Sequence, residues 1–210
     1  GWLREGLNQD FVPACLQLFK KAALKMGFHP GVPDMRLVEK WLEFYSQWPG
    51  RRVIGFSDPG SLAVKLLADS YAPRVWGASS EDAPVIDLGS GNGWPGLAFA
   101  SLGRVSLLDS RKGACDFMKG FVQYAALDNV NVSEGRAEEI GIGQDYRGQF
   151  GIVTSRAMAS PAVAVEMASP FVRPGGAAML WLGPAQEDGV AGHSTIPELG
   201  LTLEALHRYD

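Results

Sequence analysis

The chain has little cysteine and little histidine: two cysteines and three histidines among 210 residues. Cys15 and Cys115 stand far apart and outside any Cys-x-x-Cys spacing, and the histidines are scattered. No metal site and no redox pair are therefore predicted. Two packed, reduced thiols are the expectation, and they favour a cytoplasmic location.

Long apolar runs are also lacking. No stretch approaches the roughly 20 apolar residues of a membrane-spanning helix, so no membrane partner is expected. No basic segment followed by an apolar one predicts secretion. The net charge of −4 is weak evidence against a nucleic-acid partner, because phosphate contacts require Lys and Arg. The first third nevertheless carries basic residues that form either a local patch or a solvated helix surface: Lys20, Lys21, Lys25, Arg36, Lys40, Arg51, Arg52 and Lys65.

Glycine, by contrast, is abundant, with 26 residues in 210, which indicates many tight turns. The hydrophobic share of 46% suffices for one sizeable core and a small extra lobe. Apolar residues at three- and four-residue spacing predict helices over 11–28, 35–48 and 61–72, with Asp34 and Ser61 as N-caps. Residues 1–75 are therefore predicted to form an N-terminal helical extension.

Residues 76–210 have the sequence pattern of an α/β core. Short apolar runs predict strands over 84–88, 105–109, 130–133, 150–154 and 176–182, separated by helices near 95–102, 112–127, 137–140 and 160–172. This alternation predicts a parallel sheet with helices on both faces. Residues 201–210 could add a sixth strand.

The stretch "VIDLGSGNGWPGLAFA", residues 85–100, follows the first predicted strand. Its Gly91, Gly93 and Gly96 match the dinucleotide fingerprint G-x-G-x-x-G. Asp87 with Gly89, Gly91 and Gly93 also fits D-x-G-x-G-x-G, the loop of class I methyltransferases that bind S-adenosylmethionine. That cofactor has no phosphate, but its sulfonium and ammonium suit the Asp87 carboxylate. The loop therefore favours S-adenosylmethionine over a dinucleotide.

Asp109 ends the second predicted strand, 20 residues after Gly89. A carboxylate at that strand tip can accept both ribose hydroxyls of either cofactor. The alternative is a helix N-cap, a role that Ser110 could fill instead. Ribose binding is the interpretation favoured here.

Four segments, "VIDLGSGNGWPG", "LLDS", "NVNVSEGRAEE" and "VTSRAMAS", occur in order. Together they resemble the bacterial 16S ribosomal RNA guanine-N7 methyltransferases, the glucose-inhibited division protein B family. The resemblance extends over roughly residues 35–182. It implies a class I, Rossmann-like sheet and S-adenosylmethionine as cofactor. The family ends in a further strand with basic residues, which this sequence, ending at Asp210, is expected to lack.

The resemblance also implies roles for particular residues. The cofactor-binding set would be Asp87, Gly89, Gly91, Trp94, Asp109, Ala137, Glu138 and Arg156. Within it, Ala137 and Glu138 would meet the adenine, and Arg156, the catalytic candidate, would lie beside the methionine end and the incoming guanine. Each assignment has a structural alternative. Trp94 could be a core aromatic, Glu138 a helix-start acid, and Arg156 a partner of an acid such as Glu166.

The implied reaction is methyl transfer to guanine N7 in 16S rRNA, in the small ribosomal subunit or its precursor, by a protein for which a monomer is favoured. N7 has a free lone pair and needs no general base. The sequence departs from the family at Lys65, Gly113 and Leu182, positions expected to face RNA. Three alternatives therefore stay open: another methyl acceptor, RNA or small molecule; a non-catalytic cofactor-binding module; and, least favoured, an NAD-dependent oxidoreductase.

Overall fold

A computed structural model describes residues 10–50, 53–55, 58–79, 83–156, 160–183 and 195–207. Within these ranges one sheet is present, with the strand order β3-β2-β1-β4-β5 and every neighbouring pair parallel. The strands are β1 (Val85–Leu88), β2 (Val105–Asp109), β3 (Val130–Glu134), β4 (Phe150–Arg156) and β5 (Val172–Trp181). The order reverses direction between β1 and β4, which is where ligands bind in open α/β sheets.

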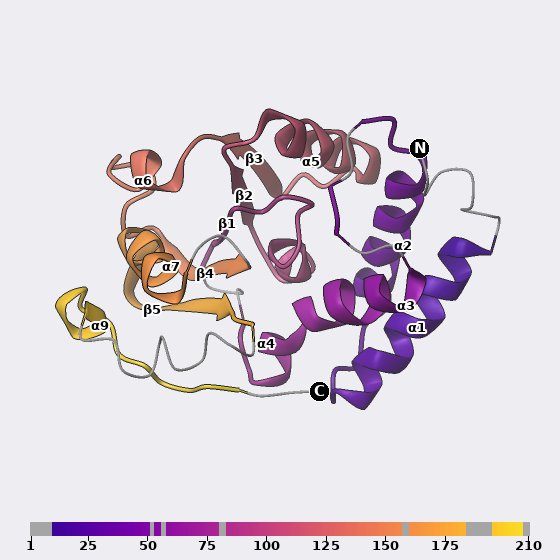
Figure 1. Ribbon diagram of the computed structural model, residues 1–210, viewed down its shortest axis with the longest axis horizontal. Helices are drawn as coiled ribbons and strands as arrows, with labels where there is room; N and C mark the ends of the chain where they lie inside the picture. Colours follow the sequence, from indigo (N-terminus) through magenta and orange to yellow (C-terminus); the bar gives the residue numbers. More distant parts are fainter. Residues whose placement is uncertain are drawn as a thin grey trace.

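Helices cover both faces of this sheet, as the sequence predicted (Figure 1). Alternate residues of each strand point to opposite faces. Val85 belongs to the larger hydrophobic cluster, with α5 (Lys112–Ala125) and the N-terminal helices, whereas Ile86 belongs to the smaller one, which includes Ala137 of α6 (Ala137–Ile140) and Ala168 of α7 (Pro161–Ala168). The predicted α/β class is confirmed.

The N-terminal helices lie together beside the sheet (Figure 1). They are α1 (Phe11–Lys25), α2 (Val32–Gln47), α3 (Pro59–Ser61), the π-helix η1 (Leu62–Ala68) and α4 (Ala72–Val75). Phe19, Trp41 and Leu67 of these helices are fully buried in the cluster that also contains Val85 and Val105 of the sheet. The predicted N-terminal extension thus shares its core with the strands.

Two predicted helix caps are wrong. Helix α2 begins at Val32 after Gly31, so Asp34 is its third residue, where Oδ2 accepts the Gly31 N–H at 3.0 Å. The other oxygen of Asp34 accepts from Arg74 Nη1 at 2.7 Å, a buried ion pair between α2 and α4. The cap at Ser61 belongs to Asp58, whose Oδ1 accepts the Ser61 N–H at 2.7 Å.

Other predictions differ from the structure in extent. The helix expected near 95–102 is a single 3-10 turn, η2 (Gly96–Phe99), after a cis Trp94–Pro95 bond. Strand β5 begins four residues early, at Val172. The possible sixth strand is not formed: residues 201–207 have no regular structure, and 208–210 lie outside the described residues. Among the described residues, no helix combines the length and apolar composition needed to cross a bilayer.

Candidate cofactor and acceptor site

The residues singled out at strand ends lie along one edge of the sheet. Because all five described strands are parallel, their carboxyl ends meet there. The register pairs Asp109 with Glu134 and Arg156 with Trp181. Asp87 stands one residue before the end of β1, between these two pairs. The sheet therefore gathers side chains from five strands at one edge.

Asp87 is completely buried on the face of β1 that packs against η2. Its Oδ1 accepts a hydrogen bond from Thr154 Oγ1 of β4 at 2.7 Å, and its Oδ2 is buried without a hydrogen-bond partner among the described residues. Burial raises the pKa of this carboxyl to about 7, against the opposing effect of the Thr154 hydroxyl. The Ser90 hydroxyl, the Gly96 N–H and the Arg156 charge also oppose this rise in pKa, and a cationic ligand nearby would further favour the ionised form.

The glycine loop is tied to both neighbouring strands. Ser90 Oγ donates to the Asp87 carbonyl at 2.8 Å and accepts the Leu108 N–H at 3.2 Å. Gly91 has a φ of +58°, a left-handed conformation that favours glycine. Its N–H donates to Asp109 Oδ2 at 2.8 Å. The loop backbone is thus held against the two acids that the sequence predicted to bind the cofactor.

Gly96 is needed for close packing. A Cβ at this position would lie 2.6 Å from Asp87 Cβ and 2.7 Å from Leu107 Cδ2, and the Asp87 Cβ cannot move without its strand. We expect Gly96→Ala to lower the free energy of unfolding by about 1–3 kcal/mol, the usual effect of overpacking. Gly113→Ala is the control, because its Cβ would meet nothing within 4 Å in α5. Urea denaturation of both variants checks the prediction, which a neutral Gly96→Ala would contradict.

Asp109 is almost fully buried, and its carboxylate accepts several hydrogen bonds. Besides Gly91, it accepts the Arg111 N–H at 2.8 Å, and the Arg111 guanidinium contacts both oxygens, at 3.1 and 3.2 Å. Arg111 itself is 72% exposed, so it is the partner that a ribose can replace. The residue before helix α5 is Arg111, so Asp109 is not the N-cap of that helix.

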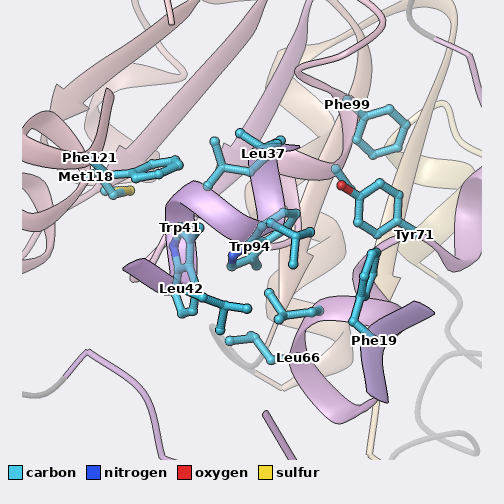
Figure 2. Close-up of a cluster of buried hydrophobic side chains, with 14 of the residues drawn as sticks. Phe19, Leu37, Trp41, Leu42, Leu66, Tyr71, Trp94, Phe99, Met118 and Phe121 are labelled. Carbon is cyan, nitrogen blue, oxygen red and sulfur yellow. The ribbon is translucent and has the colours of Figure 1, made fainter. Parts of the chain in front are cut away.

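Trp94 lies in the core, 3% exposed. Its ring packs on Trp41 and Tyr71, with centroid distances of 6.2 and 5.8 Å, and points into the cluster formed by the N-terminal helices (Figure 2). The position of the Trp94 side chain therefore favours the structural alternative, a core aromatic. A contact between Trp94 and the cofactor stays a prediction and would be made by the Trp94 backbone.

Ala137 and Glu138 begin α6, after β3. Ala137 is buried against the smaller core cluster. The Glu138 side chain is exposed and accepts from Arg136 Nη1 at 3.3 Å. Their place beyond the end of β3 is consistent with the predicted adenine contact, which the structure leaves as a prediction.

Arg156 ends β4, and its partner is Asp69, not Glu166. The Arg156 Nη2 lies 2.8 Å from Asp69 Oδ2, and both side chains are 18% exposed. The Cζ of Arg156 also lies 5.2 Å from the centre of the Trp181 ring. Sequence reasoning missed Asp69, Trp181 and Arg111 as members of this site. The segment "LLADS" was the available signal for Asp69, but sequence alone does not show which cation it meets.

The described residues fit S-adenosylmethionine. Asp109 accepts through both oxygens at the tip of β2, as ribose binding requires, and the Asp87 oxygen without a partner suits a positively charged methionine end. A left-handed Gly91 leaves space above the loop where any side chain would approach Arg111. Within the same described ranges, no three His, Cys, Asp or Glu side chains gather as metal ligands.

This fold and this loop define the chain as a class I S-adenosylmethionine-dependent methyltransferase. Among solved structures, it is similar to the tRNA (m1A58) methyltransferase TrmI from Aquifex aeolicus, with a TM-score of 0.55, 14% identity, and coverage of 77% of this chain and 58% of that one. That likeness supports the fold. Residues 36–200 match the family described as rRNA small subunit methyltransferase G (GidB), and the chain belongs to this family.

Curated relatives agree with the family assignment. The protein named ribosomal RNA small subunit methyltransferase G of Thermotoga maritima is 36% identical over 198 residues, covering 92% of this chain and 81% of the relative. The protein of the same name from Leuconostoc citreum is 36% identical over 156 residues, covering 71% of this chain and 65% of the relative. The resemblance stated from the sequence motifs is thereby confirmed.

Proposed function

We propose that this chain transfers a methyl group from S-adenosylmethionine to N7 of a guanine in 16S rRNA, in the small ribosomal subunit or its precursor. The observation that carries the proposal is the row of Asp87, Asp109 and Arg156 along one sheet edge in a member of a family whose curated relatives are named for small-subunit rRNA. A cytoplasmic location belongs to this proposal, and a monomer is the favoured oligomeric state.

The proposed cofactor supplies an electrophilic methyl group on a positively charged sulfur. Asp109 would bind the ribose in place of the Arg111 guanidinium, and Asp87 would balance positive charge below the loop. The backbone of Gly89 and Gly91 would allow close approach. Ala137 and Glu138 would contact the adenine beyond β3. Each of these roles is assigned to a residue that lies at or beside the carboxyl end of a strand.

The acceptor step needs no proton transfer before attack, because guanine N7 has a free lone pair. The bound cofactor would supply the methyl carbon to N7 by direct displacement, with the electrons of the carbon–sulfur bond passing to sulfur. The cysteines take no part: burial raises the pKa of Cys15 to about 11 and also raises that of Cys115. Catalysis then depends on alignment, which can contribute several kcal/mol. Arg156 would orient the guanine, for example through O6.

Exposed cations supply a surface for the RNA backbone. In the described residues, Lys20, Lys21 and Lys25 are exposed on α1, and Lys65 is exposed on η1. Lys40 differs, since its Nζ donates to the Ala125 carbonyl at 3.3 Å and so ties α2 to α5. Arg51 and Arg52 lie outside the described residues. Arg36 is also exposed, on α2, so the proposed RNA-binding surface rests on α1, α2 and η1 rather than on the whole basic set.

Two measurements test the function. Calorimetry with S-adenosylhomocysteine should show binding to the folded chain, and its absence would refute the cofactor assignment. Methyl transfer to small subunits from cells lacking the gene, read by mass spectrometry of the RNA, should label a guanine. Binding without any transfer to total RNA would indicate the non-catalytic module instead, and transfer to a different molecule would indicate another acceptor.

We expect Asp109→Ala to weaken S-adenosylhomocysteine binding by about 1–3 kcal/mol, because the ribose hydroxyls and the Gly91 N–H lose a common acceptor. Asp116→Ala is the matched control, since Asp116 is an exposed acid whose carboxylate pairs with Lys112 at 2.8 Å. Calorimetry on both variants measures the difference. Equal affinities for the two variants would remove Asp109 from the cofactor site.

A further inference from the structure

Arg156 is held from the N-terminal helices, not only by its own strand. Asp69 Oδ2 lies 2.8 Å from its Nη2, and the Ser70 Oγ accepts from the same nitrogen at 3.0 Å. The Leu66 carbonyl accepts from Nη1 at 3.3 Å. Three acceptors from one short segment therefore surround a guanidinium that belongs to β4. Such a set fixes both the position and the plane of the group.

The geometry of η1 makes these contacts possible. It is a π-helix over Leu62–Ala68, wider than an α-helix, and such turns are frequent at functional sites. The Leu66 carbonyl accepts the Ser70 hydroxyl at 2.6 Å and the Asp69 N–H as well as Arg156. The wide turn thus places a carbonyl, a carboxylate and a hydroxyl around one cation.

Trp181 completes the arrangement from the next strand. It is the register partner of Arg156, and its ring centre lies 5.2 Å from the Arg156 Cζ. Its Nε1 donates to the backbone carbonyl of Asp69 at 3.2 Å. Asp69 therefore holds the guanidinium by its side chain and the neighbouring indole by its backbone.

We propose that Asp69 is a positioning residue for the methyl acceptor, acting through Arg156. This inference rests on the proposed function. A guanidinium paired with a carboxylate is neutralised, so it is poorly suited to grip a phosphate. Held in a fixed plane beside an indole, it can instead orient a neutral, planar base. Asp69 thereby sets the orientation in which guanine meets the reacting methyl group.

The competing explanation is that the ion pair merely fastens the N-terminal helices to the sheet. A double-mutant cycle separates the two roles, because residues that act as a unit lose activity non-additively. Asp69→Asn, Arg156→Lys and the double variant are compared with the full-length chain, using small subunits from cells lacking the gene. Asp116→Asn, which removes the same charge from the exposed Lys112–Asp116 pair, is the control.

We expect Asp69→Asn to lower kcat about 10- to 100-fold, the effect of a small misalignment, with KM for the subunit changed by less than about threefold. The affinity for S-adenosylhomocysteine and the Tm should stay close to those of the control. The double variant should be no slower than Arg156→Lys. Trp181→Phe keeps the ring but removes the bond to the Asp69 carbonyl, and it should lower kcat by about threefold even if Asp69→Asn fails to fold.

Unchanged kcat in Asp69→Asn and Trp181→Phe would overturn the inference. So would losses that multiply in the double variant, or a fall in kcat matched by a fall in Tm and in S-adenosylhomocysteine affinity. A wild-type chain that methylates no subunit would refute the proposed function and this inference together. An active wild type with active variants refutes the inference alone.

Discussion

Asp87→Asn is expected to make the ligand-free chain more stable than wild type at pH 8, and to leave the two nearly equal at pH 4. The buried carboxyl has a pKa of about 7, against an ordinary value of 3.8. The folded chain therefore retains this proton to higher pH than the unfolded chain. Stability from this group is complete below about pH 4 and is lost as the pH rises through 7. Three pH units correspond to about 4 kcal/mol, an upper bound for the difference between the variants.

Urea denaturation from pH 4 to pH 8 measures this effect, since other titrating groups are common to both chains and cancel. The asparagine can still accept the hydrogen bond that Thr154 Oγ1 donates to Asp87 Oδ1 in wild type. The variant therefore removes the titratable charge and keeps this hydrogen bond. Parallel stability curves for the two proteins would show that Asp87 does not titrate in this range.

The same titration has a consequence for binding. A positively charged ligand favours the ionised form of Asp87, so S-adenosylmethionine affinity should rise with pH through about 7 in wild type and stay flat in Asp87→Asn. Calorimetry at several pH values gives both curves. A common pH dependence in the two proteins would place the positive charge of the ligand away from Asp87.

Trp41→Ala is expected to lower the free energy of unfolding by about 3–5 kcal/mol, the range for deleting a large buried aromatic. Trp41 of α2 is fully buried, stacks on Tyr45 with centroids 5.3 Å apart, and meets Phe117 of α5 edge-on at 6.0 Å. Its removal leaves a cavity where the N-terminal helices meet α5. Trp76→Ala is the control, because Trp76 is 42% exposed, and its loss should cost about 1 kcal/mol or less.

Trp41 also supports the cofactor loop directly. Its Nε1 donates to the Asn92 carbonyl at 3.0 Å, inside the glycine loop. Trp41→Phe keeps most of the ring volume and removes this bond, so it should cost about 1–3 kcal/mol of stability and weaken S-adenosylhomocysteine binding more than Trp76→Ala does. Equal binding by these two variants would show that the loop does not depend on α2.

The sheet and its loop could be predicted from sequence because their signals are local. The run from Val85 to Gly96 has a strand, an acid and a turn in fixed order, and each feature restricts the backbone where it stands. The same holds for Asp109, which follows its strand directly. Motifs of this kind carry their own geometry, so the family and the edge of the sheet followed from them.

Side-chain partners could not be predicted, because they depend on which distant segments pack together. Asp34 is of a residue type that is common at helix N-caps, but its ion pair with Arg74 forms only once α2 and α4 pack together. Arg156 had an acid nearby in sequence, Glu166, yet its partner is Asp69, the residue that follows η1. Trp94 stands in the loop predicted to bind the cofactor, but its side chain is buried in the cluster that includes the N-terminal helices.

The π-helix also constrains how this chain can change over evolution. In an α-helix each residue turns the chain by about 100°, and a π-helix accommodates its extra residue by widening its turns. Deleting one residue from Leu62–Ala68 would let the segment relax to an ordinary helix and swing Asp69 away from Arg156. The length of this segment is therefore as much a part of the site as the identity of its residues. Insertions and deletions within Leu62–Ala68 should therefore be tolerated poorly.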